Sequence, residues 1–283
     1  MGAFAIDRHA LLPTPELHAT IARAELDGVR NSVATVARLY PQAGAEYIEV
    51  GGGVLAFAGA HSPFSKAFGV GALAPIDDGD VARITTFYES RHAKARVFAT
   101  PLADPALGRA LAAAGFAPAE YDSILVAVDP DAHPLRDERV SVAPDLEAWI
   151  RASVAGFAER RKVAHDDTVA RVVASSPDAI VLEAREGDAI VATAGLSVRG
   201  DCAVLFAAST LPEHRHRGWQ LALIRDRIAR ARDAGARIIY AAAAPDSISE
   251  RNFHRCSFRT IYTRARWDAI AQFRNHYAIH MEQ

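Results

Sequence analysis

The feature that most constrains the fold of this chain is a strand-like run followed at once by a basic turn and a helix. Residues 202–210 read as a strand, and the turn Arg215-His-Arg-Gly218 follows. After it, Leu221, Ile224 and Ile228 recur at helical spacing on one face. A strand that leads directly into an amphipathic helix predicts a sheet with helices packed on its faces.

The same segment predicts an anion site. The first turn of a helix exposes free backbone N–H groups and the positive end of the helix dipole. Arg215 and Arg217 add full charges, and Gly218 allows a ligand to approach the backbone closely. We expect a phosphate or pyrophosphate there. The alternative is that both arginines are ordinary solvated charges in a turn.

Composition narrows the class of protein. The 283 residues, half of them hydrophobic, suggest one large or two medium domains, and the net charge of −2 gives no reason to expect nucleic acid or an acidic membrane as a partner. Two cysteines are too few for a disulfide framework and favour a reducing compartment. No apolar run approaches the ~20 residues of a membrane helix, and no leader is recognisable, so we expect a cytoplasmic protein.

A polar segment with two prolines, residues 129–139, reads as a linker between two halves. We therefore predict domains at 1–134 and 135–283. Each half contains a strand–helix–strand unit of nearly equal length, with 21 steps along the chain from Ala95 to Phe116 and 22 from Ala236 to Phe258. Asp104-Pro105 marks one helix start and the capping box 247–250 marks the other. The recurrence suggests a duplication.

The second half reads in the order β-α-α-β-β-β-α-β-α-β. Asp145 is the expected N-cap of its first helix, in which Trp149 and Phe157 belong to a core stripe. Three strands over 180–210 form a meander, with turns at 186–188 and 199–201. The predicted class is α/β, with an α+β mixed sheet and flanking helices.

This order resembles the GNAT superfamily of acyl-CoA-dependent N-acetyltransferases. The family motif Arg/Gln-x-x-Gly-x-Gly/Ala is matched by Arg215 and Gly218, and departs at Gln220. A second family segment, Asn-x-x-Ser-x(7)-Gly-Phe, is matched at its Ser and Phe positions by Ser249 and Phe258. Asp246 stands at its Asn position and Ser257 at its Gly position. The resemblance covers 139–267 well and 1–130 as a degenerate copy, which implies two tandem GNAT-like domains, each a mixed, mostly antiparallel sheet.

The resemblance implies that the co-substrate is acetyl-CoA and that the reaction is direct acetyl transfer to a primary amine of a small molecule or peptide. It also implies the binding residues. The pyrophosphate would be held by Arg215, His216, Arg217, Gly218, Trp219 and Gln220. Backbone groups for pantetheine would come from Ser209, Thr210 and Leu211. Ser249 and Asn252, on the following helix, would reach the pantetheine or the acyl carbonyl.

The catalytic residues stay undetermined at this stage. A Tyr of the family often protonates the departing thiolate, but Phe253 stands at that position. Tyr240, Tyr262 or water are the alternatives. The strand 202–210 contains no carboxylate, so the candidate bases that remain are Glu183, Asp166 and Asp167.

The first half lacks the basic turn. Asp77, Asp78 and Asp80 at the equivalent place would repel a pyrophosphate, and Pro75 disfavours an early helix. We predict that this half binds no CoA and instead completes the substrate cleft or a dimer surface. His276 and His280 have metal-ligand spacing without a third ligand, so no metal is expected.

Two other functions remain open. The replacement at Phe253 and the missing strand carboxylate would suit a non-catalytic acyl-CoA-binding sensor or interaction module. A nucleotide-binding protein using the same helix start is a third reading, although no Gly-x-x-x-x-Gly-Lys-Ser/Thr loop supports it. The sequence identifies neither the acceptor amine nor the oligomeric state, and a homodimer stays open.

Overall fold

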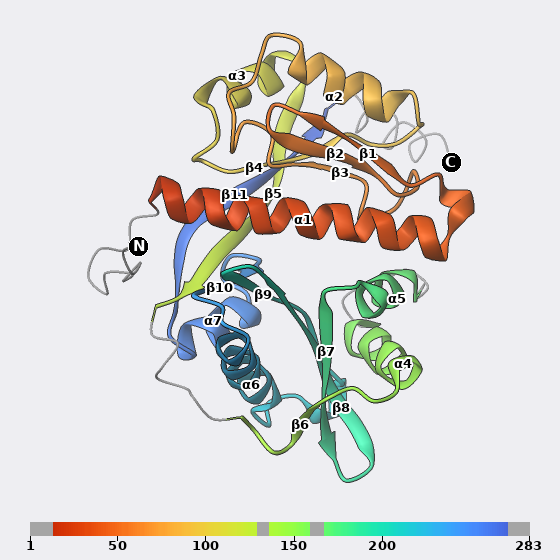
Figure 1. Ribbon diagram of the computed structural model, residues 1–283, viewed down its shortest axis with the longest axis vertical. Helices are drawn as coiled ribbons and strands as arrows, with labels where there is room; N and C mark the ends of the chain where they lie inside the picture. The colour runs from red at the N-terminus through yellow and green to blue at the C-terminus, as the bar shows by residue number, and fades with distance from the viewer. Residues whose placement is uncertain (1–13, 129–135, 159–166, 271–283) are drawn as a thin grey trace, which may run out of the picture. The chain divides into compact units, whose positions relative to one another are not determined.

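The computed structural model describes residues 14–128, 136–158 and 167–270 (Figure 1). The described chain forms two compact units. The C-terminal unit comprises residues 123–261, and the N-terminal unit comprises residues 14–122 together with residues 262–270. Each unit is a mixed sheet with helices packed against it, in agreement with the predicted class.

The sheet of the C-terminal unit contains one parallel pair. Its strands lie in the order β6, β7, β8, β9, β10, β5. Neighbours run antiparallel except β9 and β10, where Cys202 pairs with Ile238 and Leu205 with Ala241. The strand bounds are β5 Phe116–Ala127, β6 Val140–Val142, β7 Ala179–Glu186, β8 Ala189–Arg199, β9 Cys202–Thr210 and β10 Ile238–Ala243.

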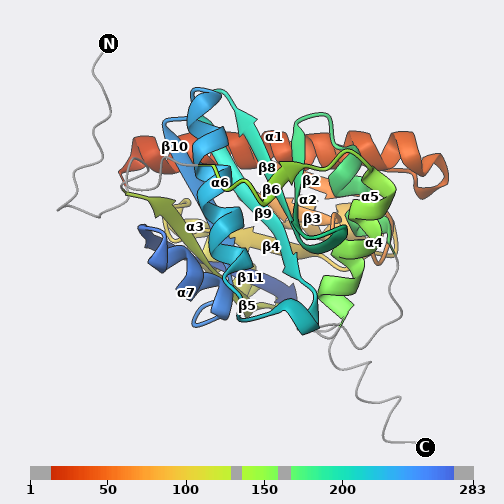
Figure 2. The ribbon, with the colours of Figure 1, turned by 90° about the horizontal axis from the view of Figure 1, so that it is seen from below.

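Helices cover both faces of this sheet (Figures 1 and 2). Val181 of β7 packs with Trp149 of α4, whereas the adjacent Leu182 belongs to the cluster that contains Leu223 and Ile228 of α6. Adjacent strand residues point to opposite faces, so α4 and α6 lie on opposite sides. The helix bounds are α4 Leu146–Phe157, α5 Thr168–Ser175, η4 Pro212–His214, α6 Trp219–Asp233 and α7 Ile248–Arg255.

The predicted helix starts are confirmed. Asp145 accepts a hydrogen bond from the Ala148 N–H at 3.0 Å, and Ser247 accepts one from the Glu250 N–H at 3.1 Å. Each side chain satisfies one of the amides that a helix start leaves free. The predicted order of helices and strands in this half is confirmed as well.

Strand β9 bulges in its middle. Thr193 pairs with Ser209 and Gly195 pairs with Phe206, so Ala207 and the residue after it oppose a single residue of β8. Ala207 takes a left-handed φ of 49°. The ladder to β10 ends at Leu205, and β9 then continues to Thr210 without a β10 partner. The two parallel strands therefore part beyond the bulge.

A buried arginine supports the bulge from the α6 side. Arg227 is fully buried, and its Nη1 donates to the carbonyl oxygens of Gly195 at 3.1 Å and Phe206 at 3.3 Å. Burial lowers the pKa of Arg227 to about 9. This cost in solvation is offset by hydrogen bonds to carbonyls that the irregular ladder leaves available.

The N-terminal unit has strands and helices of its own. Its strands lie in the order β1, β2, β3, β4, β11. The long helix α1 begins after Thr14, whose Oγ1 accepts from the Leu17 N–H, and it buries Leu26, Val29 and Val33 against β2 and β3. Helix α1 has no counterpart among the elements expected from the sequence. The bounds are α1 Pro15–Leu39, η1 Pro41–Ala43, β1 Glu46–Val50, β2 Gly53–Phe57, β3 Lys66–Phe68, α2 Asp80–Glu89, β4 Arg96–Ala99, α3 Pro105–Ala113 and β11 Phe258–Ala269.

The two units share one pairing pattern. Going along β1, β2, β3, β4 and β11, the neighbours are antiparallel, antiparallel, parallel and antiparallel, as they are along β7, β8, β9, β10 and β5. In each unit the last of these strands comes from the other half of the sequence. Residues 123–126 of β5 pair with β10, and residues 265–268 of β11 pair with β4.

This exchange makes the compact units differ from the division at 134/135 expected from the linker. Strands β5 and β11 each cross from one unit to the other, because each pairs with the sheet of the opposite half. Most of the linker, residues 129–135, lies outside the described residues. The boundary of the duplicated sequence halves stays a prediction.

Carboxylates of the chain itself accept hydrogen bonds from backbone amides just before α2 in the N-terminal unit. Asp80 accepts from the Asp77 N–H at 2.8 Å, Asp77 accepts from the Gly79 N–H at 2.7 Å, and Asp104 accepts from the Ile76 N–H at 3.1 Å. Arg83 donates to both Asp77 and Asp80 at 2.6 Å. The amides and the cation near this helix start are thus already engaged by anions.

Candidate functional site

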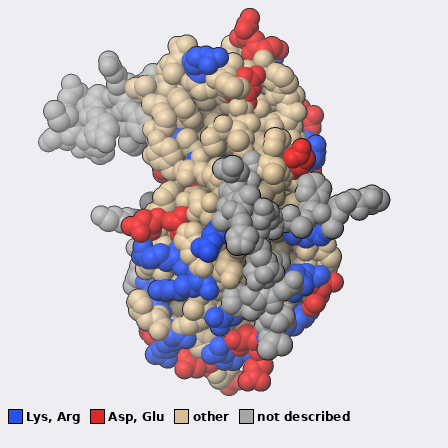
Figure 3. Space-filling model, turned by 90° about the vertical axis from the view of Figure 1, so that its left-hand side faces the viewer, with Lys and Arg blue, Asp and Glu red and all other residues tan. Residues whose placement is uncertain are grey.

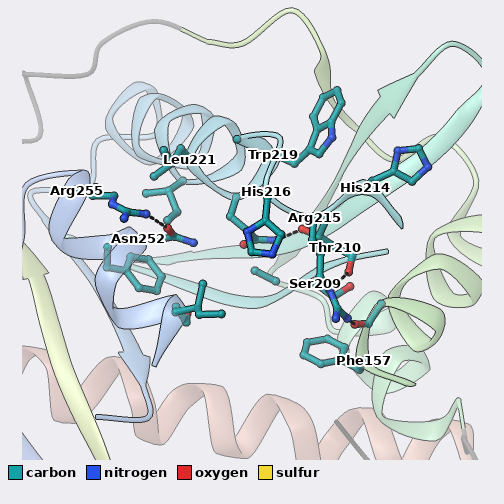
Figure 4. Close-up of a pocket in the computed structure, with 18 residues that line it drawn as sticks. Phe157, Ser209, Thr210, His214, Arg215, His216, Trp219, Leu221, Asn252 and Arg255 are labelled. Atoms are coloured by element: carbon teal, nitrogen blue, oxygen red, sulfur yellow. Dashed lines mark hydrogen bonds between the residues drawn. The ribbon is translucent and has the colours of Figure 1, made fainter. Parts of the chain in front are cut away.

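A cavity of about 450 Å³ opens where β9 leaves β10 in the C-terminal unit (Figure 4). The end of α4, the end of β9, the turn after η4, the first turns of α6 and one face of α7 form its walls. Nine of the eleven residues predicted to bind a cofactor line it: Ser209, Thr210, Arg215, His216, Gly218, Trp219, Gln220, Ser249 and Asn252.

The turn into α6 leaves its amides open to the cavity. Gly218 is the N-cap residue with φ 81°, and no side chain caps the helix. A Cβ on Gly218 would meet nothing within 4 Å, so the glycine serves the left-handed backbone and the space beside it is open. His216 also takes a left-handed φ, 63°, although it carries a side chain. Its ring lies in the cavity near Arg215 and Thr210 (Figure 4).

The Arg215 side chain links the end of β9 to the end of α4 at the cavity wall. Its Nε donates to the Thr210 carbonyl at 3.3 Å and its Nη2 donates to the Gly156 carbonyl at 3.4 Å. Gln220 donates from Nε2 to Thr210 Oγ1 at 2.7 Å. The residue at which the motif departs from Gly or Ala therefore ties the first turn of α6 to the end of β9.

The end of β9 packs tightly against α4. Ser209 Oγ lies 2.9 Å from Thr193 Oγ1, and a Cβ on Gly156 would come within 2.3 Å of Ser209 Oγ. Gly156 therefore has no room for a side chain, and α4 and β9 are held at a fixed close distance. The next residue, Phe157, lines the cavity, which corrects the prediction that it belongs only to a core stripe.

Two predicted residues do not line the cavity. Arg217 points to Glu186 instead, donating from Nη1 to Oε2 at 3.0 Å, while His214 Nδ1 lies 2.8 Å from the same oxygen. Leu211 uses both of its backbone groups locally: its N–H donates to Val191 at 3.0 Å and its carbonyl accepts from His214 at 3.0 Å.

Helix α7 supplies the opposite wall. Ser249, Asn252 and Phe253 line the cavity as a face of this helix. Arg255, which the sequence analysis does not single out, donates from Nη1 to Asn252 Oδ1 at 3.1 Å and lines the cavity as well. Asp246 and Ser257 take left-handed φ angles of 54° and 61° at either end of α7, so the glycine-like geometry expected at Ser257 is present.

The candidate catalytic groups lie apart from this cavity. Glu183 is buried on β7 and bonds to Arg185 at 2.6 Å, and Tyr240 is buried on β10; neither lines the cavity. Asp167 precedes α5 and pairs with Arg171. Tyr262 belongs to the N-terminal unit. Asp166 lies outside the described residues, and no carboxylate lines the cavity in the part of the chain that is described.

Neither a metal centre nor a membrane segment emerges from the described ranges. No group of three or more His, Cys, Asp or Glu side chains there is placed to hold a metal ion. The pair His276 and His280 lies outside those ranges. Every helix within them is too short or too polar to cross a bilayer.

Several wall residues have no signal in the sequence. Gly156 and Phe157 belong to α4, which packs against β9, and no spacing rule connects them to Gly218. Arg255 carries a weak signal, because it follows Asn252 by one helical turn and so shares its face. The wall residues on β9, in the turn and on α6 follow directly from the strand–turn–helix pattern.

The part of the chain that forms this cavity is similar to a known family of proteins. Residues 145–258 match the model of the Acetyltransferase (GNAT) family. A solved GCN5-related N-acetyltransferase from Kribbella flavida is similar over 90% of this chain and 96% of its own, with 20% identity and a TM-score of 0.63. No curated protein matches.

Two further solved structures share the fold. A tandem GNAT protein from the clavulanic acid biosynthesis pathway has a TM-score of 0.54 and 16% identity, covering 77% of this chain and 78% of its own. An acetyltransferase of the GNAT family from Colwellia psychrerythraea has a TM-score of 0.54 and 8% identity, covering 81% and 86%. At these identities the likeness concerns the fold, including its tandem form.

Proposed function

We propose that the protein transfers an acetyl group from acetyl-CoA to a primary amine of a small molecule or peptide, since residues 145–258 match the model of the Acetyltransferase (GNAT) family. The observation that carries the proposal is the cavity at the parted strands β9 and β10. It combines an uncapped helix start with Arg215 and contains no carboxylate among the described residues that line it.

The residues present fit a doubly phosphorylated ligand with a thin arm. Open space beside Gly218 and the uncapped amides of α6 suit a pyrophosphate, which Arg215 and His216 would flank. Backbone groups of β9 beyond Leu205 have no partner on β10 and would bond to the pantetheine arm. Ser249 and Asn252 would contact the same arm from α7.

Bound acetyl-CoA would supply an activated thioester, and the chain must then position it and handle a proton. The amine attacks only when neutral, so one proton has to leave. Donors are needed where negative charge develops on the carbonyl oxygen, and backbone amides of β9 beyond its ladder to β10 are the candidates. Phe253 is buried in the wall and has no proton to give, so the departing thiolate must take its proton from another group.

Titration of CoA into the purified full chain tests this function. We expect saturable binding that Arg215→Gln weakens by about tenfold or more, the magnitude of one or two lost charge-assisted hydrogen bonds. The matched control is Arg237→Gln, which removes the same charge from a surface pair with Asp201 outside the cavity. Equal CoA affinity in all three proteins would argue against the pyrophosphate site.

A second candidate is a non-catalytic acyl-CoA-binding module. Phe253 in place of a proton donor and the absence of a carboxylate from the described cavity wall favour it. Turnover distinguishes the two functions: release of free CoA that depends on an added amine, across a broad panel of primary amines, supports the enzyme. Tight CoA binding without turnover on that panel supports the module.

We also propose that the N-terminal unit binds no CoA. Just before α2 the chain's own Asp80, Asp77 and Asp104 accept hydrogen bonds from the amides of residues 77, 79 and 76, and their negative charge would repel a pyrophosphate. Between the parallel strands β3 and β4, the rings of Phe68 and Phe98 pack 5.7 Å apart. The unit would instead complete the acceptor cleft or a dimer surface.

The acceptor is proposed to be a small molecule or peptide rather than nucleic acid or membrane. On the face in Figure 3, basic side chains are interspersed with acidic ones, so no broad field of one sign is present there. The net charge of −2 agrees with this.

A further inference from the structure

Helix α7 places a polar pair at the wall of the cavity. Arg255 donates from Nη1 to Asn252 Oδ1 at 3.1 Å, and both residues line the cavity. They are one helical turn apart and so lie as neighbours on the same face of the helix. Arg255 is exposed, whereas Asn252 is only 8% exposed. The pair therefore joins a charge at the surface to an amide inside the cavity wall.

The arginine determines which end of the amide faces the cavity. A guanidinium has five N–H donors and no acceptor, so it can bond only to the oxygen of an amide. With Oδ1 held by Arg255, Nδ2 of Asn252 points away from Arg255 into the cavity (Figure 4). Across the described part of the chain no hydrogen bond engages Asn252 Nδ2. Two buried donors without a partner in the chain favour an acceptor on a bound molecule.

The guanidinium of Arg255 is not used in an ion pair. Within the described ranges its contact with Asn252 is its one hydrogen bond, and no carboxylate pairs with it. Arg251 on the same helix differs, because it pairs with Asp246 at 2.8 Å and does not line the cavity. The role of Arg255 that its contacts support is therefore to orient the Asn252 amide.

We propose that Arg255 is a positioning residue for the co-substrate, on which it acts through Asn252. The inference rests on the proposed function, in which acetyl-CoA occupies this cavity with its pantetheine arm against α7. Arg255 holds the amide so that both Nδ2 hydrogens face the arm, and a carbonyl oxygen of the arm accepts from them. Without Arg255 the amide is free to turn, and Oδ1 then faces the same carbonyl as a second acceptor.

Calorimetric titration of CoA into the full chain tests this assignment. Arg255→Met should weaken binding by about three- to tenfold, the effect of about one hydrogen bond. Arg255→Lys keeps a cation that only donates and should recover most of this loss. Arg251→Met removes the same charge from the same helix and should bind CoA like the original protein. Unchanged affinity in Arg255→Met would overturn the positioning role alone, whereas no CoA binding in any of these proteins would refute the proposed function together with it.

A double-mutant cycle separates orientation of the amide from direct contact between Arg255 and a phosphate. Once Asn252→Ala has removed the amide, Arg255→Met should weaken binding by less than about twofold more. The loss in Arg255→Met alone should also be the same at about 50 and about 500 mM NaCl, because salt screens an exposed charge but not the orientation of a buried amide. Fully additive losses, or a loss that disappears at high salt, would overturn the positioning role. The salt comparison decides the matter by itself if Asn252→Ala fails to fold.

Asn252→Asp tests whether the amide acts as a donor. The carboxylate keeps the shape of the side chain and its contact with Arg255, but it presents an acceptor to the cavity in place of two donors. CoA affinity should fall by about tenfold or more, although Arg255 is unchanged. An affinity equal to that of the original protein would show that no donor is needed at this position and would overturn the proposal.

Discussion

Arg217 forms an ion pair with Glu186, 3.0 Å from Nη1 to Oε2, although its neighbour Arg215 lines the cavity. Both partners are about half exposed, at 51% and 49%. The pair links the turn before α6 to the hairpin between β7 and β8. An exposed pair of this kind contributes little to stability, so the guanidinium is available to a stronger anion.

Glu186→Gln is therefore expected to strengthen CoA binding. Removing the carboxylate frees Arg217 and His214 to face the pyrophosphate, and the gain should be about two- to fivefold at low salt. Calorimetric titration measures it. Glu213→Gln removes the same charge from the same turn, but the Glu213 side chain does not pair with Arg217, which bonds to its backbone carbonyl. A gain of equal size in both variants would point to net charge rather than to release of Arg217.

Gly156→Ala should destabilise the C-terminal unit and disturb the cavity. The new Cβ would come within 2.7 Å of the Ser209 Cβ, so α4 or β9 must move, at a cost of about 1–3 kcal/mol in the free energy of unfolding. Denaturant titration measures the loss. Adding Ser209→Gly removes the clashing atoms and should recover much of it. Unchanged stability in the single variant would show that the two elements are not held at this distance.

Arg227→Met should also destabilise the protein. The substitution leaves the carbonyls of Gly195 and Phe206 without their donor at a buried bulge, which we expect to cost about 2–4 kcal/mol. CoA affinity should fall as well, because the bulge sets where β9 leaves β10. Arg225→Met, an exposed site on the same helix, should change the free energy of unfolding by less than about 0.5 kcal/mol. A neutral Arg227→Met variant with normal CoA affinity would contradict the role of Arg227.

The stability effect of Lys66 should depend on pH. Its folded-state pKa of about 8 lies below the unfolded value of 10.5, so the unfolded chain holds more protons between these values and stability rises with pH across that window. Lys66→Met should therefore stabilise the protein below about pH 8, and this advantage should shrink towards pH 10.5. Urea unfolding at pH 7 and pH 10 measures the difference. Lys94→Met is the exposed control and should show no such trend.

CoA should bind with a stoichiometry of one per chain. The carboxylates beside the start of α2 would repel a pyrophosphate, whereas the uncapped start of α6 faces a cavity that no described carboxylate lines. Calorimetry measures the stoichiometry. Two sites of similar affinity, or a site that persists in Arg215→Gln at full strength, would contradict this division of roles.

Much of the C-terminal unit follows from local sequence. Asp145 and Ser247 cap helices because their side chains reach the amide three residues on, and Gly218 turns the chain because it tolerates a left-handed φ. The strand–turn–helix segment brings its own residues together at the cavity. Such features depend on neighbours a few positions apart, and a sequence displays those directly.

Other features appear only once distant segments pack. Gly156 faces Ser209, and Arg217 faces Glu186 rather than the cavity, through contacts between separate elements. The exchange of β5 and β11 has no signal in the sequence, because ladder pairing and not chain order decides which strands a strand joins.

The sequence by itself determined the α/β class, the helix starts and the strand–turn–helix segment around Gly218, since each rests on short-range geometry. Only the tertiary structure decided which charges meet. Glu25 and Arg264, 239 positions apart, pair beside Lys66, and burial there changes the protonation of an amine that looks ordinary in the sequence. Solvation and charge pairing depend on distances in space, which no local pattern encodes.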